Sequence, residues 1–128
     1  MSKVLLIEDD AIMIGLLKTL LGLDGYEVMA FRGGEDVLNV IQREQPDVIL
    51  LDVNLKNFGI NDITGLDLLK HIRSDEEIKN TGVIISSGMN YKQESEEAGA
   101  NGFIMKPYMP DDLLALIRET ITKIKVCK

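Results

Sequence analysis

Several residues with reactive side chains directly follow short apolar runs, and they differ in chemistry. The runs end at Glu8-Asp9-Asp10, at Asp52, at Ser86-Ser87 and at Lys106-Pro107. Clustered carboxylates bind hard divalent cations such as Mg2+ or Mn2+, and lysine is a compact charge suited to phosphate. A carboxylate is also a known covalent acceptor of phosphoryl groups. If the fold brings these groups together, the set predicts phosphoryl transfer onto Asp52, with Ser87 donating to an incoming oxyanion.

Taken alone, Asp52 has a second interpretation, because Asp often forms turns after strands. The functional interpretation therefore depends on the elements that position these residues. Five short runs predict β-strands, over residues 3–7, 26–31, 48–52, 83–86 and 103–105. The run at 26–31 alternates and predicts an edge strand, whereas continuous apolar runs are typical of buried central strands.

Helices are predicted between and after these strands, over residues 11–23, from Gly33-Gly34 to about 45, 65–73, 91–98 and from Pro110 onward. Asp10 is a candidate N-cap for the first helix, and Thr64 with Asp67 resembles a capping box for the third. The apolar stripe of the first helix is predicted to run through Met13, Leu16, Leu20 and Leu23, widened by Ile14, Leu17 and Leu21.

This alternation predicts an α/β fold, a flavodoxin-like doubly wound (βα)5 domain with a five-stranded parallel sheet in the order 2-1-3-4-5. Right-handed crossovers place helices on both faces of such a sheet. All strands then end at the same edge, which is where ligands bind in open α/β sheets. The residues expected at that edge are Glu8, Asp9, Asp10, Asp52, Ser87 and Lys106.

The composition bounds the class of protein. A chain of 128 residues predicts one domain, 1–128. Its formal charge of −7 disfavours direct DNA or RNA binding. The absence of a signal-peptide pattern and of a long apolar run predicts a soluble, cytoplasmic protein without membrane contact. Cys127 is interpreted as an inert exposed thiol, and His71 as an ordinary helix residue.

The chain resembles the receiver domain of response regulators in two-component signalling. The matching motifs are LLIEDD at 5–10, DVILLDVN at 47–54, VIISSG at 83–88 and GFIMKP at 102–107. The resemblance extends from Lys3 to about Lys125 and implies that Asp52 is the phosphoacceptor. It also implies a phosphohistidine donor, on a sensor histidine kinase or a histidine phosphotransfer protein.

The resemblance further implies a role for each site residue. Metal ligands would be Asp9 directly, Glu8 largely through water, Asp52, and Asn54 through its backbone carbonyl. Ser87 and Phe103 would be the switch residues, and Lys106 would contact the phosphoryl group and precede a cis peptide bond to Pro107. Phosphorylation would shift the population of states and alter the face formed by the fourth helix, fifth strand and fifth helix. That face would bind a downstream protein target.

One segment departs from the pattern of the resemblance. The loop at 54–64 is several residues longer than usual, and Lys56 replaces a usual proline. It is either a lid or partner contact beside the metal site, or a tolerated surface insertion, since added loop length costs little entropy.

We expect a stand-alone phosphoacceptor domain rather than a classical enzyme, one that catalyses only its own phosphorylation and dephosphorylation. It would be a monomer or a phosphorylation-dependent dimer. Two other functions are considered. A phosphohydrolase with an aspartate nucleophile after the first strand would need a second Asp two residues on, where this chain has Ala11. A flavin binder would need a phosphate loop where this chain has acids.

Overall fold

The computed structural model describes residues 2–126, in which strands and helices alternate along the chain. The strands are β1 (Lys3–Ile7), β2 (Glu27–Ala30), β3 (Val48–Asp52), β4 (Gly82–Ser87) and β5 (Gly102–Met105). The helices are α1 (Ala11–Leu23), α2 (Val37–Glu44), α3 (Gly65–Ser74), α4 (Lys92–Glu97) and α5 (Pro110–Val126), with a short 3-10 helix η1 (Lys56–Phe58). The predicted order of elements is confirmed. Cys127 lies outside the described residues.

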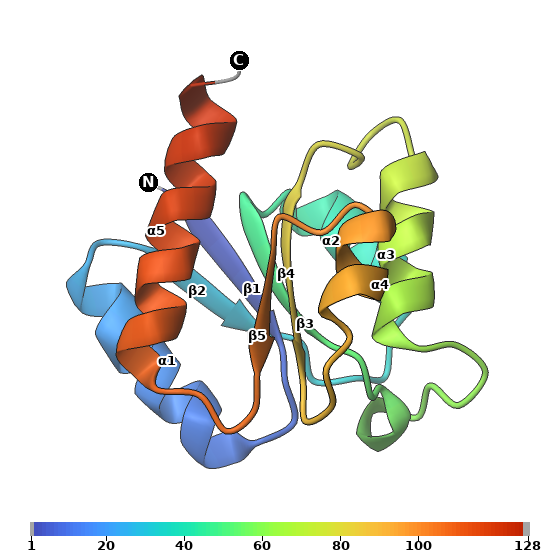
Figure 1. The fold of residues 1–128 in the computed structure, drawn as a ribbon, viewed down its shortest axis with the longest axis horizontal. Helices are drawn as coiled ribbons and strands as arrows, with labels where there is room; N and C mark the ends of the chain where they lie inside the picture. Colours follow the sequence, from blue (N-terminus) through green and yellow to red (C-terminus); the bar gives the residue numbers. More distant parts are fainter. Residues whose placement is uncertain (1, 127–128) are drawn as a thin grey trace.

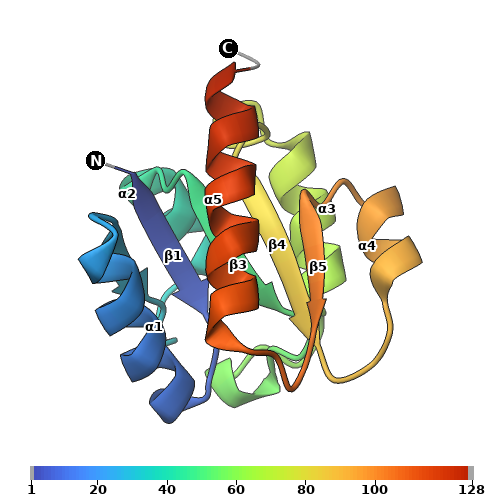
Figure 2. The same ribbon diagram turned by 60° about the vertical axis from the view of Figure 1, so that its left-hand side comes forward.

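The five strands form one parallel sheet in the order β2-β1-β3-β4-β5, as predicted. Figures 1 and 2 show α1 and α5 on one face of the sheet and α2, α3 and α4 on the other. None of the helices within residues 2–126 is apolar over a length that could cross a membrane. The three-layer arrangement leaves the two ends of the sheet, rather than its faces, open to ligands.

The core consists of two apolar clusters, one on each face of the sheet, and β3 contributes to both. Ile49 and Leu51 pack with residues of α2 and α3, whereas Val48 and Leu50 pack with residues of α1 and α5. Each such fully buried aliphatic side chain stabilises the fold by about 1.5–3 kcal/mol. Because β3 is packed on both faces, its backbone has little freedom to move, and the position of Asp52 at its end is fixed.

The predicted stripe of α1 is wrong in part. Leu17 and Leu21 are fully buried, whereas Leu16 is 41% and Leu23 is 80% exposed. Almost every position of this helix is apolar, so the spacing alone does not select the buried face. The structure turns the side of Leu17 and Leu21 toward α5 and the sheet.

The predicted start of the second helix is also wrong. Gly33 and Gly34 have φ angles of 84° and 80°, which lie in the left-handed region and not in a helix. The helix begins instead after Asp36, whose side chain accepts a hydrogen bond of 3.0 Å from the backbone N–H of Leu38. The two glycines therefore form the turn between β2 and α2.

Candidate functional site

The reactive residues that follow β1, β3, β4 and β5 meet at the carboxyl edge of the sheet, at the lower end of the strands in Figure 2. Asp9, Asp52, Ser87 and Lys106 line a single cavity of about 420 Å³. Glu8 lies behind it with only 1% of its surface exposed. The structure therefore brings together the side chains that the sequence places at separate strand ends.

Lys106 links the acids from two strands. Its Nζ lies 2.8 Å from Asp52 Oδ2 and 2.9 Å from Glu8 Oε1. Burial disfavours the charge on Lys106, but the hydrogen bonds to Asp52 and Glu8 outweigh burial and raise its pKa above the ordinary value. The lysine therefore stays protonated and fixes the orientation of the Asp52 carboxylate.

Glu8 is the most buried acid of the site, and burial is the main cause of its raised pKa. Its Oε2 accepts hydrogen bonds from the backbone N–H groups of Asp9, at 2.8 Å, and Asp10, at 3.3 Å. Lys106 Nζ is a third donor to the Glu8 carboxylate, so three hydrogen bonds fix its orientation. Glu8 is thus a rigidly held carboxyl group under the cavity.

The carboxylates of Glu8, Asp9 and Asp52 form a group in which one oxygen atom from each lies within 4.8 Å of the other two. Among the described residues, Lys106 is the cation in ion-pair contact with this group. One ammonium does not balance three carboxylates, and like charges this close disfavour joint ionisation. A hard divalent cation with oxygen ligands fits this donor set.

Ser87 and Asn54 lie beside Asp52 at the same cavity. The backbone N–H of Asn54 donates a hydrogen bond of 3.1 Å to Asp52 Oδ1, so both Asp52 oxygens have protein donors. Ser87 Oγ accepts a hydrogen bond of 3.1 Å from the backbone N–H of Met89. Its own hydroxyl proton remains available for an oxyanion placed on Asp52.

Other residues singled out in the sequence lie outside this cavity. Phe103 is partly buried on β5 and packs against the cluster on the α2–α3 face. Asp10 caps α1, as predicted, by accepting hydrogen bonds from the N–H groups of Ile12 and Met13. His71 is exposed on α3. The predicted cis peptide bond between Lys106 and Pro107 is confirmed.

Two residues of the site region were not predicted from the sequence. Asn57 Nδ2 donates a hydrogen bond to Asp9 Oδ2 across a separation of 48 positions, and this bond is the main cause of a lowered pKa at Asp9. Tyr108 places a buried hydroxyl near Glu8 and Lys106, and burial raises its pKa. The only signal in the sequence was the unusual length of the loop that carries Asn57.

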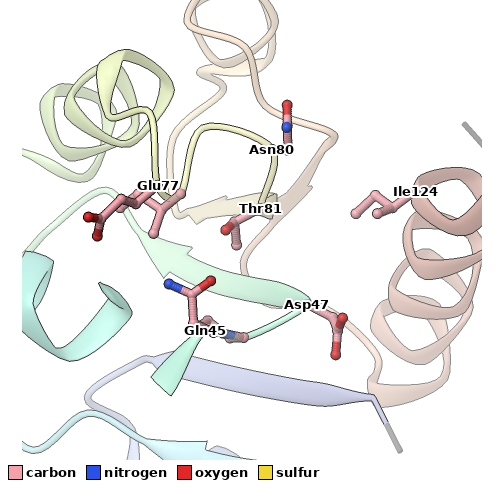
Figure 3. A pocket seen from close by; sticks show the side chains of 8 residues that line it. Gln45, Asp47, Glu77, Asn80, Thr81 and Ile124 are labelled. Carbon is pink, nitrogen blue, oxygen red and sulfur yellow. The ribbon is translucent and has the colours of Figure 1, made fainter. Parts of the chain in front are cut away.

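A second cavity, of about 240 Å³, lies at the opposite edge of the sheet, where β3 and β4 begin. Figure 3 shows Glu77 on one side of it and Ile124, from α5, on the other. The residues that line it include two acids, Asp47 and Glu77, and none with a basic side chain. It lacks the cation that a phosphoryl group requires, so the carboxyl edge is the better candidate.

Comparison with known proteins gives a consistent result. The family model of the response regulator receiver domain matches residues 4–118. The chain is 29% identical over 109 residues to the polar-differentiation response regulator DivK of Brucella ovis, covering 83% of this chain and 85% of that protein. It is 27% identical over 123 residues to the probable transcriptional regulator ycf27 of Porphyridium aerugineum, covering 96% of this chain but only 49% of that protein. The chain therefore spans about half the length of this second relative.

Solved structures share the fold over nearly the whole chain. A CheY-like response regulator receiver domain protein of Methanospirillum hungatei is similar with a TM-score of 0.83 and 26% identity, covering 100% of this chain and 99% of that one. The chemotaxis response regulator CheY4 of Vibrio cholerae has a TM-score of 0.79 and 29% identity, covering 94% of this chain and 98% of that one.

Proposed function

The chain belongs to the response regulator receiver domain family and is a phosphorylation-dependent signalling switch, and we propose that Asp52 is its phosphoacceptor. The observation that carries this proposal is the contact of Asp52 with Lys106 beside two further acids. Asp52 is the carboxylate of this group that combines a protonated lysine, a nearby hydroxyl and an opening to the cavity. Glu8 and Asp9, the two acids that follow β1, supply the other carboxylates of this group.

In the transfer step, the phosphoryl group passes from a phosphohistidine donor to Asp52. A carboxylate oxygen of Asp52 attacks the phosphorus, and the phosphorus–nitrogen bond of the donor breaks. The electron pair stays on the imidazole nitrogen, which takes up a proton. Lys106 neutralises charge on the phosphoryl oxygens, and the Ser87 hydroxyl donates a hydrogen bond to one of them. Hydrolysis of the acyl phosphate by water returns the domain to its starting state.

We propose that the carboxylates of Glu8, Asp9 and Asp52, together with the backbone carbonyl of Asn54, hold Mg2+ or Mn2+. Glu8, the most buried of the three acids, would act largely through water, as the resemblance to receiver domains implies. An ion held by these residues would supply positive charge to the negative oxygens during transfer. The residues present suit this role, since hard oxygen donors outnumber the protein cation beside them.

The switch is proposed to act through Ser87 and Phe103. The phosphoryl group carries about −1.5 to −2 charges, in place of the single negative charge of the Asp52 carboxylate, and Ser87 moves to donate to it. Phe103 is partly buried on β5, so it can turn inward into space that Ser87 leaves. The consequence is a shift between two states of the face formed by α4, β5 and α5. Met105, which is 49% exposed there, offers apolar contact area to a downstream protein.

The proposed donor is a sensor histidine kinase or a histidine phosphotransfer protein in the cytoplasm. DivK and CheY4, which the chain resembles over most of their length, are named response regulators. The formal charge of −7 argues against direct contact with DNA.

Acetyl phosphate with Mg2+ tests this function without the unknown kinase. We expect the wild-type chain to gain the mass of one phosphoryl group, labile to base and hydroxylamine, in intact mass spectrometry. The variant Asp52→Asn should gain none, whereas Asp62→Asn, an exposed acid of the neighbouring loop, should behave as wild type. An unmodified wild type would overturn the proposal.

A further inference from the structure

The long loop between β3 and α3 is packed onto the body of the protein. Leu55 is 1% exposed and anchors its first part in the core. Phe58, at the end of η1, packs against Phe31 with ring centroids 5.4 Å apart. Phe31 follows β2 and is itself 3% exposed. Leu55 and Phe58 therefore hold η1 against the core and against the end of β2, beside the site.

Asn57 lies between these two anchors and reaches the acids of β1. Its Nδ2 donates to Asp9 Oδ2, and both residues line a cavity between η1 and α1. Asp9 is exposed, unlike Glu8 and Asp52. Asn57 donates a side-chain hydrogen bond to Asp9, and Glu8 lies against the same carboxylate. The orientation of the exposed acid of the site thus depends on the loop.

We propose that Asn57 is a positioning residue for the divalent cation, and that Leu55 and Phe58 act by holding Asn57 against Asp9. This inference rests on the proposed function, because it concerns the cation that Asp52 uses. It assigns the long loop a role in setting cation affinity. The packing of Phe58 on Phe31 then also contributes to cation affinity, because it supports Asn57.

The sign of the effect follows from the hydrogen bond itself. Asn57 donates to a single oxygen of Asp9, Oδ2, and the Asp9 carboxylate still lies with one oxygen within 4.8 Å of oxygens of Glu8 and Asp52. An exposed Asp side chain otherwise loses rotamer freedom when it becomes a ligand, and here that freedom is already restricted. Donors behind ligand carboxylates typically contribute 10–100-fold to metal affinity. If the loop instead competed with the cation for Asp9, removing the Asn57 side chain would strengthen Mg2+ binding.

Isothermal titration of the full chain with MgCl2, in the absence of any phosphodonor, tests the proposal. We expect Asn57→Ala to weaken Mg2+ binding about 10-fold. The control Asn61→Ala removes an exposed asparagine of the same loop and should bind as wild type. In phosphorylation by acetyl phosphate, Asn57→Ala should need about 10-fold more Mg2+ for half-maximal rate, with an unchanged rate at saturating Mg2+.

A double-mutant cycle separates positioning from general packing. Phe58→Ala should weaken Mg2+ binding in the wild-type background, because Asn57 loses its support. In the Asn57→Ala background the same change should leave Mg2+ binding unaltered. Thermal unfolding of each variant reports folding independently. Equal losses in both backgrounds would show that Phe58 does not act through Asn57, which would overturn that part of the proposal.

Mg2+ binding and phosphoryl acceptance, measured on the wild type and on Asn57→Ala, distinguish a failure of the inference from a failure of the proposed function. A wild-type chain that neither binds Mg2+ nor accepts a phosphoryl group would refute the proposed function. A wild-type chain that does both, with Asn57→Ala binding Mg2+ equally or more tightly, would refute the inference alone.

Discussion

Gly65 lies so close to Asp52 that a β-carbon on it would meet the Asp52 carbonyl oxygen at 2.2 Å. The backbone N–H of Gly65 also donates a hydrogen bond of 2.7 Å to the carbonyl of Val53. The first residue of α3 is therefore in direct contact with the residue that carries the proposed phosphoacceptor group. This contact couples the start of α3 to the end of β3.

Replacing Gly65 with Ala should lower the free energy of unfolding by about 1–3 kcal/mol, because the backbone of β3 and α3 must separate. Urea unfolding measures the change. The control Gly22→Ala lies in α1, where an added β-carbon meets no atom within 4 Å. It should be neutral or stabilising by about 0.5–1 kcal/mol. A Gly65→Ala protein as stable as wild type would contradict the close contact.

Replacing Lys106 with Met removes the cation from the buried carboxylates of Glu8 and Asp52. Breaking a fully buried ion pair costs about 3–5 kcal/mol. Since 29% of the Lys106 side chain is exposed, water screens part of this. We expect a loss of about 2 kcal/mol in the free energy of unfolding at neutral pH, partly recovered by Mg2+. Lys92→Met, on exposed α4, should change it by less than about 0.5 kcal/mol.

The capping box of α3 gives a pH-dependent prediction. Asp67 accepts a hydrogen bond of 2.9 Å from the backbone N–H of Thr64, and this bond lowers the pKa of Asp67 below its ordinary 3.8. Asp67→Ala should cost about 1 kcal/mol of stability at neutral pH. The folded-state pKa is the lower one, so this contribution is present above pH 3.8 and is lost as the pH falls through the folded-state value.

Urea unfolding of wild type and Asp67→Ala at decreasing pH measures this difference directly. It should shrink below pH 3.8. A difference that stays constant into that range would show that the ionised carboxylate is not the stabilising group.

Movement of Phe103 can be followed by fluorescence, because the chain contains no tryptophan. In Phe103→Trp, acetyl phosphate with Mg2+ should change the emission maximum as the ring moves to a different environment. The double variant Asp52→Asn with Phe103→Trp supplies the control and should show no change. Identical spectra before and after phosphorylation would mean that this position does not take part in switching.

The sequence predicted those parts of the fold that depend on local patterns. The run Val48–Asp52 reads as a buried strand because it is short, apolar and bounded by polar residues. The buried face of α1 was not predictable, because apolar side chains occupy nearly all of that helix and tertiary packing alone selects Leu17 and Leu21. The sequence pattern places Gly33-Gly34 at the start of a helix, although paired glycines permit the positive φ angles found there.

The candidate site was predicted for a different reason, which is that parallel strands end at one edge. This rule places Asp9, Asp52 and Lys106 together without knowledge of any contact. It does not extend to loops. The hydrogen bond from Asn57 to Asp9 depends on where Leu55 and Phe58 find apolar partners, and no local pattern encodes that choice.

We expect Asp52 to be the single residue that accepts the phosphoryl group. The most direct test is to treat the chain with acetyl phosphate and Mg2+, reduce the acyl phosphate with borohydride, and locate the resulting homoserine by peptide mass spectrometry. We predict conversion at position 52, with Glu8, Asp9 and Asp10 unmodified. Conversion at one of those acids, with Asp52 intact, would contradict the account.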